Sequence, residues 1–326
     1  MNFKYWKLMF FISLMLSVLI TVSSYSWLTM WIGLEINMLC IIPLMNNTKN
    51  MYSTESSLKY FIVQAMASSL FIFSIIMSSI NDSMMISIIM NSALLTKIGS
   101  APFHFWFPEI MEGQKWMMCL LLLTIQKISP IILLNYNMNF PMFFFIIIIF
   151  NMMISALLGL NQISMRKILT FSSINHIGWM LASFTQMKMI WLTYFMIYSF
   201  ILINLIFILN TFKIYFIKQL INLNMSKEFN LIFILNFFSL AGLPPFIGFL
   251  PKWLTIQLMI VPFPVLVTIM VILTLFTMFY YLRMMLTNLM FTMNKLTNNF
   301  KINPKLKFLN FLNLFLLPLT CLIFIT

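Results

Sequence analysis

The sequence predicts an all-α membrane protein with about eleven transmembrane helices. Hydrophobic residues make up 62% of the 326 residues and charged residues only 8%, which is too little charge to cover a water-exposed surface. Apolar residues also run without interruption, as in 143–150, whereas the strands of a membrane barrel alternate apolar and polar positions. Since the backbone in lipid must satisfy its own hydrogen bonds, these runs indicate helices.

Apolar segments follow one another along the whole chain, joined by short links that leave no room for a soluble domain. A membrane-spanning helix needs about 20 apolar residues. We therefore expect one membrane domain, 1–326. Its helices are expected at 5–23, 26–45, 58–80, 84–110, 115–136, 141–161, 168–186, 190–212, 229–258, 263–287 and 306–325.

The positions of the cations predict the orientation of these helices. Of the 19 Lys and Arg residues, three lie deep within predicted helices and one, Lys188, falls on one face of the membrane, called side B. The other 15 fall on the opposite face, side A, together with the N-terminus. They are Lys4, Lys7, Lys49, Lys59, Lys115, Arg166, Lys167, Lys213, Lys218, Lys227, Arg283, Lys295, Lys301, Lys305 and Lys307. By the positive-inside rule, side A is the cytoplasm or the mitochondrial matrix, and the net charge of +13 indicates topology and not nucleic-acid binding.

Two of the predicted helices contain matching interruptions in mid-membrane. In 84–110, Gly99 is followed three positions later by Pro102, and in 229–258, Gly242 precedes Pro244 and Pro245. Proline removes a backbone donor, and glycine tolerates the irregular backbone that results. Such breaks survive in lipid only where protein or water covers them.

The two interrupted helices occupy equivalent places in two blocks of five. Repeat one covers about 5–136 and repeat two about 141–287, followed by a C-terminal helix at about 306–325. Because five is an odd number of crossings, the repeats must be inverted, and paired broken helices in inverted repeats point to a transport site. Ordinary proline kinks are the alternative interpretation.

Four charged residues lie deep within the predicted helices, away from the charges near helix ends: Glu35, Lys97, Lys127 and Lys252. Each costs roughly 2.5–3.5 kcal/mol at a helix centre unless it is paired or hydrated. We interpret them as functional, with Glu35 as a counter-ion to Lys97, although Lys252 is close enough to its segment's end to reach the interface. His104 and His176 are weaker candidates, since each could also be a hydrogen-bonded core histidine.

The sequence offers no pattern for a cofactor or metal. Its three cysteines, Cys40, Cys119 and Cys321, are scattered singly through apolar runs and are interpreted as small buried hydrophobes. There is no Gly-x-Gly-x-x-Gly run and no haem motif. We expect this chain to bind no cofactor itself.

Several motifs resemble those of the subunit 2 family of mitochondrial NADH dehydrogenase, in insect-like form. They occur in family order across nearly the whole chain, with the last seventy residues least distinctive. They are Trp31-Ile-Gly-Leu-Glu-Ile-Asn37, Ser53-Thr-Glu-Ser-Ser-Leu-Lys-Tyr-Phe61, Ala101-Pro-Phe-His-Phe-Trp-Phe-Pro108, Phe171-Ser-Ser-Ile-Asn-His-Ile-Gly-Trp179, Gly242-Leu-Pro-Pro-Phe246 and Gly248-Phe-Leu-Pro-Lys-Trp253.

The resemblance implies a membrane-arm subunit of complex I with an antiporter-like fold of two inverted five-helix repeats. The family's channel residues fall on Glu35, Lys97, Lys127 and Lys252, and both histidines also match family positions. The chain would then be part of an NADH:ubiquinone oxidoreductase without carrying a redox centre. NADH, FMN, iron–sulfur clusters and ubiquinone would bind to partner subunits, and this chain would contact other antiporter-like subunits and lipids.

The resemblance also implies the mitochondrial inner membrane, with the N-terminus in the matrix and the C-terminus in the intermembrane space. The residue bias is consistent with this, because 32 Met and 36 Phe suit an A+T-rich organellar gene. The mechanism expected is proton transfer between the four buried charges, since desolvation disfavours the charged form of a lysine. Two alternatives remain at this point: a free-standing cation/proton antiporter and a structural membrane spacer.

Overall fold

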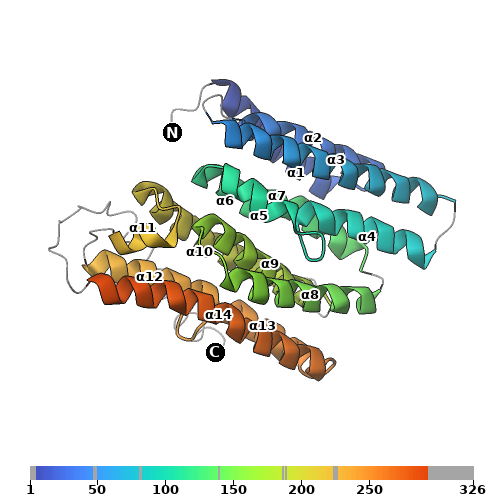
Figure 1. The fold of residues 1–326 in the computed structure, drawn as a ribbon. Helices are drawn as coiled ribbons and strands as arrows, with labels where there is room; N and C mark the ends of the chain where they lie inside the picture. The colour runs from blue at the N-terminus through green and yellow to red at the C-terminus, as the bar shows by residue number, and fades with distance from the viewer. Residues whose placement is uncertain are drawn as a thin grey trace. The chain divides into compact units, whose positions relative to one another are not determined.

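A computed structural model describes residues 5–46, 50–80, 83–138, 140–185, 187, 189–222 and 227–292. Within these ranges it contains fourteen α-helices, and its β-structure is limited to an isolated bridge between Ser164 and Phe216. The chain divides into two compact units, unit 1 at Met1–Ile147 and unit 2 at Ile148–Thr326 (Figure 1). Several predictions fall outside the described residues: the helix at 306–325, Cys321, Lys4, Lys49, Lys188, Lys295, Lys301, Lys305 and Lys307.

In unit 1, α1 packs against α2 and α3 packs against α4. Figure 1 shows α1, α2 and α3 side by side. Its helices are α1 Tyr5–Ser23, α2 Trp27–Met45, α3 Met51–Ser78, α4 Met84–Ile98, α5 Trp106–Gly113, α6 Trp116–Leu123 and α7 Ile125–Tyr136. The hydroxyl oxygen of Ser26 accepts from the N–H of Thr29 and caps α2. Gly33 lets α2 approach α1 closely, because a side chain there would collide with Thr21.

Helix α8, Pro141–Leu160, crosses the division between the units, and the remaining helices belong to unit 2. They are α9 Met165–Phe184, α10 Ile190–Phe212, α11 Ile217–Asn222, α12 Lys227–Ala241, α13 Phe249–Met259 and α14 Pro264–Thr292. Every residue of α9 from Ile168 to Phe184 is buried. Helix α9 is therefore the central helix of unit 2, surrounded by protein on all sides.

The helices confirm a polytopic helical membrane protein. Seven stretches among the described residues are long and apolar enough to cross a membrane: α1, α2, α3, α6 with α7, α8, α10 and Pro264–Met284 of α14. One predicted boundary was wrong, and one helix was not expected. Helix α3 begins at Met51 and not at 58, because Ser53, Ser56 and Ser57 satisfy their hydroxyls on carbonyls three residues back and so fit a helix. The six-residue helix α11 was not expected.

The breaks at Gly99 and Gly242 have the same backbone geometry. Both glycines adopt left-handed conformations, with φ of +78° and +77°, which an L-residue rarely adopts. In each break the glycine N–H donates to the carbonyls three and four residues back, and the next N–H donates to the residue four before the glycine. This is the Schellman pattern of a helix end. In both cases the following helix begins seven residues after the glycine, at Trp106 and Phe249.

A third break, in the predicted helix 115–136, was not expected. Helix α6 ends at Leu123 and α7 begins at Ile125, with Thr124 between them at φ −117° and ψ −79°. The Thr124 hydroxyl donates to the carbonyl of Leu120 at 2.7 Å, a local bond that competes with the helix backbone. Pro130 lies inside α7, where it can offer no N–H to the carbonyl of Gln126. The backbone is thus irregular on both sides of Lys127.

Candidate proton-transfer site

The buried lysines predicted from the sequence all lie in the protein interior. In unit 1, Lys97 is 7% exposed and Lys127 is 1% exposed, and Glu35 is partly buried. In unit 2, Lys252 is 6% exposed. Each lysine is close to one of the breaks described above: Lys97 lies in the last turn of α4, Lys127 follows the Thr124 break, and Lys252 lies in the first turn of α13. The breaks therefore bring irregular backbone next to each buried charge.

Lys97 interacts with Glu35 at a distance. The carboxylate of Glu35 acts electrostatically on the ammonium of Lys97, but no ion pair within 4 Å joins the two side chains, because both ion pairs found in the described ranges are formed by Lys59. The amide of Gln64 donates to the backbone carbonyl of Lys97 at 3.4 Å. Glu35 and Lys97 are thus coupled through space and not through a direct contact.

A chain of side-chain hydrogen bonds connects α3, α7 and α2 beside Lys97. The hydroxyl of Tyr60 donates to Gln126 at 3.1 Å, the amide of Gln126 donates to Asn37 at 2.7 Å, and the amide of Asn37 donates to Ser129 at 3.3 Å. A small cavity of about 10 Å³ is lined by these four residues and by Lys97. Its volume is close to that needed for one water molecule. Two neighbours of Lys127 on α7 therefore line the same cavity as Lys97.

Sequence reasoning missed the four neutral members of this chain. Asn37 lies two positions after Glu35, and Gln126 lies immediately before Lys127. The available signal was the cost of an amide in an apolar helix, which is high unless the amide is hydrogen-bonded. That signal could have marked Asn37 and Gln126 separately, but it could not have shown that the two residues are hydrogen-bonded to each other.

Lys127 is placed by an aromatic side chain from the helix after the first break. Its Nζ lies 5.3 Å from the ring centroid of Phe107, a residue of α5 that is 1% exposed. A cation over an aromatic face is stabilised by the ring's negative electrostatic surface. The position of α5 therefore fixes the surroundings of Lys127.

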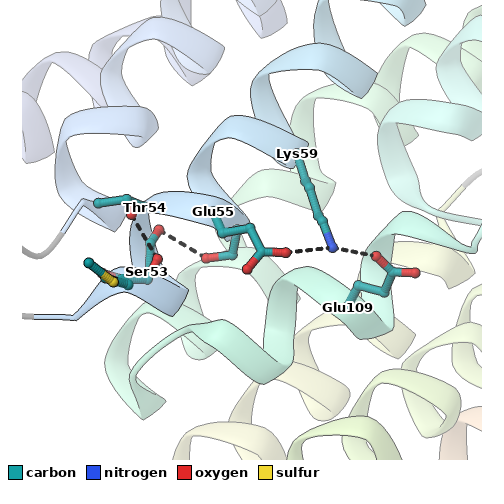
Figure 2. A network of polar contacts seen from close by, with 7 residues as sticks. Ser53, Thr54, Glu55, Lys59 and Glu109 are labelled. Carbon is teal, nitrogen blue, oxygen red and sulfur yellow. Dashed lines mark hydrogen bonds and ion pairs between the residues drawn. The ribbon is translucent and has the colours of Figure 1, made fainter.

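Helix α5 is held against the beginning of α3 by polar contacts. Lys59 of α3 bonds to Glu109 of α5 at 3.0 Å and to Glu55 of its own helix at 3.1 Å, and these side chains are 45–60% exposed (Figure 2). Deeper in the same junction, the amide of Gln114 donates to the hydroxyl of Ser56 at 2.7 Å. Gly113 permits the close approach, because a Cβ there would lie 2.6 Å from the carbonyl oxygen of Tyr52.

Lys252 belongs to α13, after the second break, and its side chain reaches back to the end of α12. Its Nζ donates to the carbonyl oxygen of Ala241, the last residue of α12, at 2.7 Å. The same atom lies 6.0 Å from the ring centroid of Trp179. A Cβ on Gly242 would lie 2.8 Å from Cδ of Lys252, so glycine at this position makes room for the lysine. The left-handed turn therefore supplies both the acceptor and the space.

The two histidines have different environments. His104 lies in the turn between α4 and α5, where its Nδ1 is 3.3 Å from the carbonyl oxygen of Pro102. His176, on α9, has its Nδ1 2.8 Å from the hydroxyl of Tyr194, and its ring centroid is 4.8 Å from that of Tyr198. Both tyrosines are on α10, and neither was singled out from the sequence. In the part of the chain that the structure describes, no three His, Cys, Asp or Glu side chains gather as a metal site.

The fold is similar to that of membrane subunits in respiratory complexes. A chain in the structure described as respiratory complex I from Thermus thermophilus with bound Aureothin aligns with a TM-score of 0.84 at 20% identity, covering 96% of this chain and 77% of that one. A chain of an archaeal membrane-bound sulfane sulfur reductase aligns with a TM-score of 0.80 at 14% identity, covering 94% and 71%. These likenesses establish the fold.

Sequence comparisons establish the family. The family described as NADH:quinone oxidoreductase/Mrp antiporter, TM, matches residues 24–277. The chain is 48% identical over 305 residues to NADH-ubiquinone oxidoreductase chain 2 of Anopheles gambiae, covering 89% of each protein. It is 40% identical over 285 residues to the protein of that name from Locusta migratoria, covering 85% of this chain and 83% of the relative. This chain therefore belongs to the NADH-ubiquinone oxidoreductase chain 2 family, within the NADH:quinone oxidoreductase/Mrp antiporter transmembrane proteins.

Proposed function

We propose that this chain is a proton-translocating subunit in the membrane arm of a respiratory NADH:ubiquinone oxidoreductase of the mitochondrial inner membrane. The names of its relatives support the assignment. The observation that carries it is the arrangement in unit 1, where the buried Lys97 lines a cavity of one-water size together with the residues next to Lys127. A structural spacer has no use for buried lysines, each of which costs several kcal/mol of insertion free energy.

In this proposal, water in the cavity carries a proton between Lys97 and Lys127. The ammonium of Lys127 gives a proton to the water, and the water passes a proton to the neutral amine of Lys97. One positive charge thereby moves from α7 to α4. The Coulomb attraction between Glu35 and Lys97 depends on their separation, so a displacement of α2 would change how strongly Lys97 holds its proton.

Lys252 would serve the same purpose in unit 2. Its hydrogen bond to the carbonyl oxygen of Ala241 stabilises the protonated amine, and this acceptor is available because the helix ends there. His104 and His176 are proposed as additional proton carriers. His176 is hydrogen-bonded to the hydroxyl of Tyr194, and a tyrosine hydroxyl can either donate or accept such a bond.

We also propose that unit 1 and unit 2 contain the two inverted five-helix repeats, completed by a C-terminal helix. The equal hydrogen-bond pattern and equal length of the breaks at Gly99 and Gly242 support this. With the N-terminus in the matrix, eleven crossings would leave the C-terminus in the intermembrane space. Electron transfer from NADH to ubiquinone would take place in partner subunits.

The first experiment asks whether the chain belongs to an assembled complex. Gently solubilised inner membranes are separated on a native gel, probed for this chain and stained for NADH dehydrogenase activity. We expect the chain to migrate with the active band at high mass. Migration as a small free species, together with sodium- or potassium-dependent proton flux, would replace this proposal with a free-standing antiporter.

The second experiment tests proton transfer by Lys127. We expect Lys127→Met to slow proton translocation by about 10²–10⁴-fold, which is the usual effect of losing a positioned proton-transfer group. Lys115→Met is the matched control, because Lys115 is an exposed lysine at the start of α6. The rate of proton translocation and the number of protons moved per NADH are both measured in assembled complex. If neither falls in Lys127→Met, Lys127 is not on the path.

A further inference from the structure

Two buried asparagines join α4 to the end of α7 in unit 1. The amide of Asn91 donates to the backbone carbonyl of Asn137 at 3.0 Å, and the amide of Asn137 donates to the side-chain oxygen of Asn91 at 3.1 Å. Asn91 is 0% exposed and Asn137 is 7% exposed. In an apolar interior, burying an amide is costly unless the amide is hydrogen-bonded, so these two bonds favour the pairing.

A cavity of about 380 Å³ lies directly beside this pair. Asn137 lines it, as does Met90, the neighbour of Asn91, and serines contribute from two helices: Ser78 at the end of α3, and Ser83 and Ser87 at the beginning of α4. This volume is far above the 10–15 Å³ or so that one water molecule needs. Serine hydroxyls and an asparagine amide supply the hydrogen-bonding partners that water requires. The cavity can therefore hold water.

The cavity occupies one end of unit 1. It is lined where α2 begins, α3 ends, α4 begins and α7 ends, which is side B in the topology expected from the cations. The exposed charges Lys59, Glu109 and Lys115 belong to the opposite helix ends. Lys97 follows Asn91 by six residues on α4, which corresponds to about 9 Å along a helix. Along α4, Asn91 therefore lies between the cavity-lining Ser87 and the buried Lys97.

We propose that this cavity is a water-filled vestibule open to side B, and that the Asn91–Asn137 pair is its inner gate. The inference rests on the proposed function, since it assigns an exit to the proton held by Lys97. When the two hydrogen bonds open, vestibule water reaches the ammonium of Lys97. An N–H bond then breaks, the proton passes to water and leaves on side B, and a water on the Lys127 side reprotonates the neutral amine.

Asparagine suits such a gate because its amide carries no titratable proton. While both hydrogen bonds are closed, the pair excludes water and offers no group that can take up and release a proton. Hydrogen bonds between neutral groups contribute little net free energy each, because water replaces them when they open. Opening the gate therefore costs little free energy and leaves no buried charge unpaired.

The vestibule is tested by thiol labelling of assembled complex in oriented membranes. A membrane-impermeant methanethiosulfonate reagent is applied to one side at a time to chains carrying Ser87→Cys. The control is Ser69→Cys, since Ser69 is exposed within the membrane-spanning helix α3 and does not line the cavity. Labelling of the parent chain, with its native Cys40, Cys119 and Cys321, sets the background. We expect Ser87→Cys to react from side B only and Ser69→Cys not to react. An unreactive Ser87→Cys would mean that lipid or another subunit fills the cavity, and would overturn the proposal.

The gate is tested with Asn91→Ala and, independently, Asn137→Ala. Asn135→Ala is the matched control, because Asn135 is on α7 but outside the pair. We expect either gate variant to lose protons per NADH and to leak protons in the absence of NADH, whereas Asn135→Ala keeps both values of the parent. Tight coupling in an assembled gate variant would overturn the gate.

The outcomes also separate this inference from the proposed function. If Lys97→Met keeps the proton-to-NADH ratio while Ser87→Cys reacts from side B, the proposed role of Lys97 fails and the vestibule stands. If Lys97→Met loses proton transfer and Ser87→Cys does not react, the proposed function stands and the vestibule is rejected. Should one gate variant fail to assemble, the other and the labelling result still decide.

Discussion

At the scale of single residues, Gly242 has no side chain, and this leaves the space that the side chain of Lys252 occupies. Lys252 lies over the α-carbon of Gly242 and reaches the carbonyl oxygen of Ala241. The sequence indicated a break at this glycine and a buried lysine ten residues later, because both residue types carry strong local signals. The contact between them was not predictable, since it depends on how α13 folds back on the end of α12.

We expect Gly242→Ala to displace Lys252 from Ala241. The added Cβ would lie 2.8 Å from the lysine's Cδ, and an L-residue in a left-handed conformation costs roughly 1–2 kcal/mol. The measurement is protons per NADH in assembled complex, with thermal stability recorded alongside. Gly178→Ala, which introduces a Cβ into unit 2 away from the lysine, serves as the control. A normal ratio in assembled Gly242→Ala would show that this placement of Lys252 does not matter for pumping.

We expect Tyr194→Phe to perturb His176 more than Tyr198→Phe does. Tyr194 makes the 2.8 Å hydrogen bond to the histidine, whereas Tyr198 contacts it through its ring, which phenylalanine keeps. Losing a buried hydrogen-bond partner costs about 1–3 kcal/mol. Thermal unfolding of the assembled complex compares Tyr194→Phe with the parent, and an unchanged unfolding temperature would contradict the assigned bond.

At the scale of elements, the three breaks differ in how far the sequence could predict them. Gly99 and Gly242 are followed by prolines, so the local backbone preference already excludes a continuous helix. Thr124 offers no such signal. Its hydroxyl bonds to the carbonyl of Leu120, but threonine does this in many helices that continue without interruption. The hydrogen-bonded chain from Tyr60 to Ser129 was hidden for a different reason, because its bonds join residues 66, 89 and 92 positions apart in the sequence.

Helix α5 provides an experiment at this scale, since it is short and positions Phe107 beside Lys127. We expect Glu109→Gln to loosen α5 and to lower protons per NADH, with an effect smaller than that of Lys127→Met because Gln114 still bonds to Ser56. Glu55→Gln removes the other partner of Lys59 (Figure 2) but leaves α3 and α5 joined. It should therefore retain the parent ratio. Equal effects of the two variants would assign the result to surface charge and not to α5.

At the scale of the whole molecule, the distribution of cations predicts which parts of the chain face side A. Lys115 in unit 1 and Lys213 and Lys218 in unit 2 are exposed, and the expected topology places all three on that side. A membrane-impermeant amine reagent should modify them from the matrix side of inverted vesicles and not from the other side. Labelling of Lys115 and Lys213 from opposite sides would contradict the inverted repeats.

The burial of α9 has a consequence for biogenesis. Protein surrounds this helix on all sides, and its middle carries Ser172, Ser173, Asn175 and His176. Accordingly it is not among the seven stretches apolar enough to span a membrane by composition. A helix of this kind gains little by entering lipid alone. We therefore expect the insertion machinery to retain α9 until its partner α10 has been synthesised, so that the two helices leave the insertase together.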